Sequence, residues 1–86
     1  MANIEEVRSG ILQANQKAEE SMGALQQAQG SLEQAQASLQ RATEGSNQAD
    51  VSEASNMLSQ AVSSITEVLQ QVQSAIQTSE GISNRL

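Results

Sequence analysis

The apolar residues in the first half of the chain recur every seven positions, in two columns. The a positions are Ile4, Ile11, Ala18, Leu25, Leu32 and Leu39, and the d positions are Val7, Ala14, Ser21, Ala28, Ala35 and Ala42. A repeat kept over more than five heptads is typical of a long helix that packs along one stripe. Asn3 followed by Glu6 is a capping-box pattern. We therefore predict a helix over residues 4–44.

The second half of the chain repeats the same heptad pattern. Its a positions are Val51, Leu58, Ile65, Val72, Ser79 and Leu86, and its d positions are Ala54, Ala61, Val68, Ala75 and Ile82. Asp50 is a good N-cap residue, and Glu53 three positions later completes a second capping signal. The pattern predicts a helix over residues 51–84.

Residues 45–50 connect the two predicted helices. Gly45 can end a helix in the left-handed conformation, and Ser46, Asn47 and Asp50 complete a polar turn. A connection this short forces the helices to run antiparallel. We expect one all-α domain over residues 1–86, an antiparallel two-helix hairpin of the coiled-coil type. Leu39 should lie level with Ala54.

Within this hairpin, the best-buried large residues should be Leu32, Leu39, Leu58 and Ile65. A further apolar column, at the e positions of the second helix, lies beside the expected seam, and Met22 widens the stripe on the first helix. The candidate partner-contact residues are Met22, Val62, Leu69 and Ile76. A two-helix hairpin cannot bury so wide a stripe alone. The alternatives are a loosely covered surface or a contact face.

We favour the contact face, through which hairpins would pair into a four-helix bundle. The partner would be a second copy, giving a homodimer, or another helical protein, giving a heterodimer. The e and g positions carry few charged residues, so few charges dictate the choice of partner.

The composition argues against several classes of function. The 86 residues include no Cys, His, Pro or aromatic residue, and the net charge is −6. Without a basic stripe, binding to nucleic acid is not expected, and no apolar run is long enough for membrane insertion. The N-terminal "MANIEEVRSG" lacks the regions of a cleavable signal peptide. We expect a cytoplasmic protein, with export by a signal-peptide-independent route left open.

Candidate chemistry is absent from the sequence. Lack of His and Cys removes the commonest metal ligands, general base and thiol nucleophile. The adjacent pairs Glu5–Glu6 and Glu19–Glu20 point about 100° apart on a helix and do not converge. The sequence therefore predicts no catalytic residues, no cofactor site and no metal site, and it indicates a protein that is not an enzyme.

An acidic, Pro-free helical hairpin with the turn "EGSNQAD", Glu44 to Asp50, resembles the small WXG-type (ESAT-like) proteins of type VII secretion. The family's Trp-x-Gly turn would fall here, with its Gly at Gly45, but the Trp is missing. The tail "TSEGISNRL" also lacks the Tyr of the family's export motif. The chain is similar, too, to small Ala/Gln-rich actinobacterial proteins of unknown function.

The resemblance implies dimeric four-helix bundles that are exported folded. It implies a non-enzymatic helical interaction protein associated with type VII secretion, as a secreted partner or as an accessory or chaperone of a larger effector. The alternative is a cytosolic coiled-coil module that oligomerises or scaffolds without any link to secretion.

Overall fold

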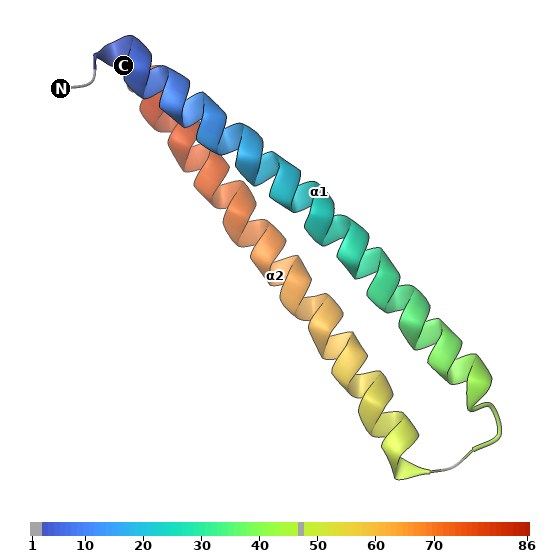
Figure 1. Cartoon of the computed structure of the whole chain (residues 1–86). Coiled ribbons are helices and arrows are strands. Elements are labelled where there is room, and N and C mark those ends of the chain that lie inside the picture. The colour runs from blue at the N-terminus through green and yellow to red at the C-terminus, as the bar shows by residue number, and fades with distance from the viewer. Residues whose placement is uncertain (1–2, 47) are drawn as a thin grey trace.

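The computed structural model describes residues 3–46 and 48–86, and these form an antiparallel helical hairpin (Figure 1). Helix α1 spans Ile4–Ala42 and helix α2 spans Ala49–Arg85. The two helices lie side by side, with the turn at one end and the N-terminal end of α1 beside the C-terminal end of α2 at the other. The molecule measures 64 × 18 × 14 Å. The predicted all-α hairpin is confirmed.

The start of α1 follows the predicted capping pattern. Asn3 has an extended backbone, with φ −83° and ψ 173°, and its side-chain oxygen accepts a hydrogen bond of 2.8 Å from the backbone N–H of Glu6. This bond satisfies one of the N–H groups that a helix start leaves without a partner. Glu5 and Glu6 place negative charge in the first turn, where the helix dipole favours it.

The turn begins two residues before the predicted end of the first helix. The Leu39 carbonyl oxygen accepts two hydrogen bonds from Thr43 at the end of α1, one from the backbone N–H over 3.1 Å and one from the hydroxyl over 2.6 Å. Gly45 then has φ +85°, a left-handed conformation that glycine adopts without a steric penalty. The N–H of Ser46 donates back to the Thr43 carbonyl oxygen over 2.9 Å. Asn47, predicted as part of this turn, lies outside the described residues.

The start of α2 differs from the sequence prediction. The N-cap is Gln48, whose side chain makes no capping bond, and the backbone N–H of Val51 donates to the Gln48 carbonyl oxygen over 3.1 Å. The prediction that Asp50 caps this helix is therefore wrong, because the helical turn begins before it. Asp50 lies within the first turn, where its carboxylate still interacts favourably with the helix dipole.

Hydrogen bonds between the helices define their register. The Gln36 side-chain amide donates to the Ser59 hydroxyl over 2.6 Å and to the Ser55 carbonyl oxygen over 3.3 Å. Gln36 therefore lies level with position 57, midway between its two partners. This is the predicted register, in which Leu39 lies level with Ala54.

Gln29 gives the same register further along the hairpin. Its side-chain amide donates to the Thr66 hydroxyl over 2.7 Å and to the Val62 carbonyl oxygen over 3.3 Å. Gln29 therefore lies level with position 64, so the two helices keep one register over the middle of the hairpin.

The interface between the helices, here called the seam, uses the predicted a columns but a different second column. From α1 the second column is Asn15, Met22, Gln29, Gln36 and Thr43, and from α2 it is Ser55, Val62, Leu69, Ile76 and Ser83. Ile76 is buried and the others are half-buried. Most of the predicted d column is exposed instead, including Ala28 and Ala35 on α1 and Val68 and Ile82 on α2. The prediction of a seam built on d positions is wrong.

A difference in side-chain size explains why α2 turns its e column, and not its d column, toward α1. Both candidate columns of α2 are apolar, but the d column is mainly alanine, whereas the e column contains Val62, Leu69 and Ile76. Burial stabilises in proportion to the apolar area removed from water. Packing the larger column inward therefore gains more free energy than packing the alanines inward.

The core is small. Ile76, with 7% of its surface exposed, is the only buried residue in the described part of the chain. Leu32, Leu39, Leu58 and Ile65, predicted to be the best-buried residues, are only half-buried. Two helices leave both sides of their seam open to water, so a seam leucine keeps part of its surface exposed. The prediction of a core centred near the turn is wrong.

Ile76→Ala tests this position of the core. We expect a loss of about 2–4 kcal/mol in the free energy of unfolding, because the substitution leaves a cavity in the best-packed layer. The matched control is Leu12→Ala, since Leu12 is 59% exposed, and it should cost less than about 1 kcal/mol. Urea unfolding at one fixed protein concentration measures both. Equal midpoints for the two variants would contradict the observed seam.

Candidate protein-interaction face

The outward-facing d columns of the two helices lie on the same side of the seam. In both helices the d column lies three residues after the a column, and because the helices are antiparallel, this equal offset points both columns to one side. The residues of this surface, here called the alanine-rich face, are Val7, Ala14, Ser21, Ala28, Ala35 and Ala42 of α1 and Ala54, Ala61, Val68, Ala75 and Ile82 of α2. Val7, Ala54 and Ala61 are half-buried and the others are exposed.

The alanine-rich face is apolar and shallow along the length of the hairpin. Val68 and Ile82 are 39% and 40% exposed, and most of the other positions carry only a methyl group. Small side chains let a second helix approach closely, because the distance between packed helices depends on the side chains at the contact. This surface is suited to packing against another helical element.

The charge distribution also distinguishes this face. None of its residues is charged, although the chain carries a net charge of −6. The neighbouring columns, which form its rim, contain three charged residues: Lys17 on α1 and Asp50 and Arg85 on α2. Lys17 already pairs with Glu20 over 3.4 Å. All the glutamates lie on other columns or in the turn, so a partner on this face avoids most of the negative charge.

The opposite side of the hairpin is polar. It carries the hydrogen bonds from Gln29 and Gln36, and at the open end it has a depression of about 300 Å³ between the two helices. The residues that line the depression are Ile11, Leu12, Asn15, Gln16, Glu19, Glu80, Ser83 and Asn84. The ionisable groups among them are the carboxylates of Glu19 and Glu80.

The described residues contain no group of three potential metal ligands. Across the same part of the chain, neither helix combines the length and hydrophobicity needed to span a membrane.

The predicted partner-contact residues lie elsewhere. Met22, Val62 and Leu69 are half-buried and Ile76 is buried, all in the columns of the seam. The prediction that they form a flank outside the hairpin is therefore wrong; α1 covers the α2 residues, and α2 covers Met22. Among the predicted turn residues, Gly45 and Ser46 lie in the turn, whereas Asp50 lies in α2, at the rim of the alanine-rich face.

Sequence reasoning missed the alanine-rich face because it assigned these columns to the seam. One signal could have found it. Gln29 and Gln36 recur seven residues apart on α1, and Ser55, Ser59 and Thr66 lie at matching levels on α2. Pairing these polar groups across the helices turns the glutamines inward and the alanines outward.

No family model, no curated protein and no solved structure matches the chain.

Gln36→Ala tests whether the hydrogen bonds of the seam hold this arrangement. We expect a loss of about 1 kcal/mol in the free energy of unfolding, the usual net contribution of such bonds. Gln27→Ala is the matched control, because Gln27 is exposed on the far side of α1, and its effect should stay below about 0.5 kcal/mol. Thermal unfolding followed by circular dichroism measures both. A Gln36 variant as stable as the control would show that the seam does not depend on this glutamine.

Proposed function

We propose that this chain is a non-enzymatic helical interaction protein that binds another helical protein through its alanine-rich face. One observation carries the proposal. The hairpin exposes 6358 Å² of surface, whereas a compact monomeric protein of 9.1 kDa exposes about 4,900 Å². The isolated hairpin thus keeps more surface in water than folded proteins of its size do.

The dimensions of the hairpin support the same proposal. Its broad side measures 64 by 18 Å. The product of these two lengths exceeds the roughly 800 Å² of surface that each partner buries in an interface of standard size. Packing another pair of helices on this side would complete a four-helix bundle, an arrangement in which short-looped antiparallel helices commonly bury their apolar stripes. The partner would also cover Val68 and Ile82.

For the biological setting, we propose a WXG-like role associated with type VII secretion, as a secreted partner or as an accessory or chaperone of a larger effector. The hairpin architecture and the acidic, Pro-free sequence support this setting. The missing Trp of the turn and the missing Tyr of the tail favour the alternative, a cytosolic module that oligomerises or scaffolds.

Whether the protein is exported distinguishes the secretion role from the cytosolic alternative. The protein would be followed in the culture medium of its source organism, before and after deletion of the type VII secretion ATPase. Loss of extracellular protein on deletion would support the secretion role. Protein that stays in the cells of both strains, with no secretion component co-purifying, would support the cytosolic alternative.

Val68→Glu tests the interaction itself. A carboxylate in the middle of the alanine-rich face would lose its hydration on binding, so we expect at least a tenfold loss of affinity, equivalent to about 1.4 kcal/mol. Helicity should be unchanged, because Val68 points away from the seam. Ser74→Glu is the control, since Ser74 is exposed on the far side of α2. Sedimentation and pull-down with the native partner measure association. Wild-type binding by the Val68 variant would contradict the proposal.

A further inference from the structure

We infer that a second copy of this chain covers the alanine-rich face, packed face to face with its turn at the opposite end. This inference rests on the proposed function and names the partner. In the resulting four-helix bundle, α1 lies against α1 of the second copy and α2 against α2, in antiparallel pairs related by one two-fold axis perpendicular to the helices. Three features of the face support this arrangement.

The first feature is the position of the axis. Val68 is the middle residue of the outward-facing d column on α2, which runs from Ala54 to Ile82. In the observed register, Val68 lies level with position 25 of α1, since Gln29 lies level with position 64. Position 25 is also the middle of the outward-facing d column on α1, which runs from Val7 to Ala42. A single two-fold axis at this level therefore places each column of one copy against the same column of the second copy, running in the opposite direction.

The second feature is the match of side-chain sizes about that axis. On α2, Ile82 of one copy faces Ala54 of the other, and Val68 faces Val68 at the axis. On α1, Val7 faces Ala42. Large side chains thus meet small ones at both ends of the bundle, which fills space without overlap. Two hairpins running in the same direction would instead bring Val7 and Ile82 together at the open end and leave alanine against alanine at the turn.

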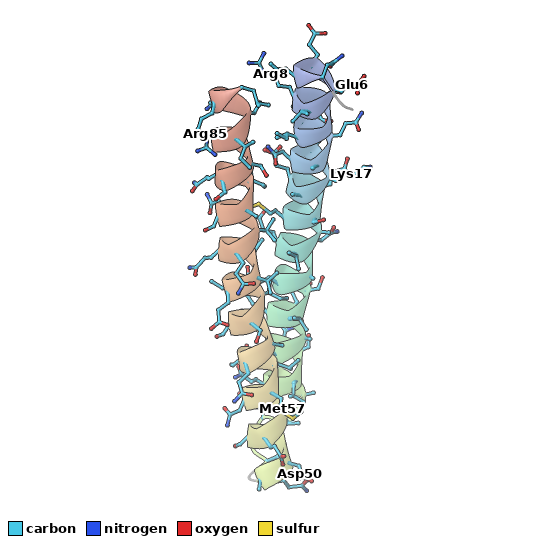
Figure 2. The ribbon with its side chains drawn as sticks, turned by 90° about the vertical axis from the view of Figure 1, so that its left-hand side faces the viewer. Glu6, Arg8, Lys17, Asp50, Met57 and Arg85 are labelled. Atoms are coloured by element: carbon cyan, nitrogen blue, oxygen red, sulfur yellow. The ribbon has the colours of Figure 1, made fainter. Side chains whose placement is uncertain are left out.

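The third feature is charge complementarity at the rim. Asp50 lies beside the turn and Arg85 near the opposite end of the same helix (Figure 2). Reversing the second copy brings Asp50 of each copy next to Arg85 of the other, so two pairs of opposite charge form, one at each end. With the hairpins in the same direction, Asp50 would lie level with the uncharged Thr43, and the nearest cation, Arg41, would lie on the far side of α1 from the seam. The absence of glutamates from the face also limits repulsion between two acidic copies.

Disulfide cross-linking tests this geometry, because the chain contains no cysteine. In the Val68→Cys variant, the two introduced thiols meet at the axis, within reach of the Cα–Cα distance of roughly 4.4–6.8 Å that a disulfide requires. We expect mild oxidation with glutathione to convert most of this variant into a covalent dimer on a non-reducing gel. The Ser74→Cys control, exposed on the far side of α2, should remain mainly monomeric.

A mixing experiment tests the orientation separately. Ala54→Cys and Ile82→Cys proteins should cross-link with each other more than either does with itself. If sedimentation shows a wild-type dimer but Val68→Cys cross-links no better than the control, the proposed orientation is wrong.

Failure of the second copy as partner is distinguishable from failure of the proposed function. If the wild-type chain is monomeric at micromolar concentration, a homodimer on this face is ruled out. The proposed function nevertheless stands if a helical protein from the source organism binds the purified wild type and loses affinity for the Val68→Glu variant. If that partner binds both proteins equally, the alanine-rich face is not an interaction surface, and both proposals fail.

Discussion

The hairpin depends on how a chain without aromatic residues distributes its few large aliphatic side chains. Helix α2 has two apolar columns that could join the a column in the seam, and only one of them can do so, whereas the corresponding second column of α1 is polar except for Met22. Burying the column of Val62, Leu69 and Ile76 removes more apolar surface from water than burying alanines. The helices turn accordingly, and the alanines face outward. The exposed alanine-rich face is thus a consequence of forming the best available seam.

The seam is stabilised by polar contacts as well as by aliphatic ones. Gln29 and Gln36 reach across from α1 to hydroxyl and carbonyl groups of α2. Each bond contributes a modest net stability, but leaving the glutamine amide without a partner in the seam would cost more. These pairs therefore favour one register over neighbouring ones. Ile76 is the one buried residue in the described part of the chain. The hairpin therefore has little apolar core of its own, and burying more apolar surface on an outer face would stabilise it.

Much of the fold could be predicted from the sequence. Heptad periodicity, the Asn3 cap and Gly45 gave two antiparallel helices in the observed register. The choice of face could not be read from hydrophobicity, because the alanine d column and the aliphatic e column of α2 are both apolar. The observed seam also contains hydrogen bonds from glutamines of α1 to serine and threonine hydroxyls of α2. These bonds can be predicted only by considering the sequences of both helices together. For the same reason Met22, Val62, Leu69 and Ile76 were assigned to a partner surface, whereas they hold the hairpin together.

The central claim is that the alanine-rich face of one hairpin packs against the same face of a second. Small-angle X-ray scattering combined with sedimentation equilibrium tests it most directly, because together they report both mass and length. We predict a particle of twice the 9.1 kDa chain mass that remains close to the 64 Å length of one hairpin, since the two copies lie side by side. A particle of single-chain mass at high concentration would contradict the claim. So would a dimer of about twice that length, which would join the hairpins end to end or as opened, exchanged helices.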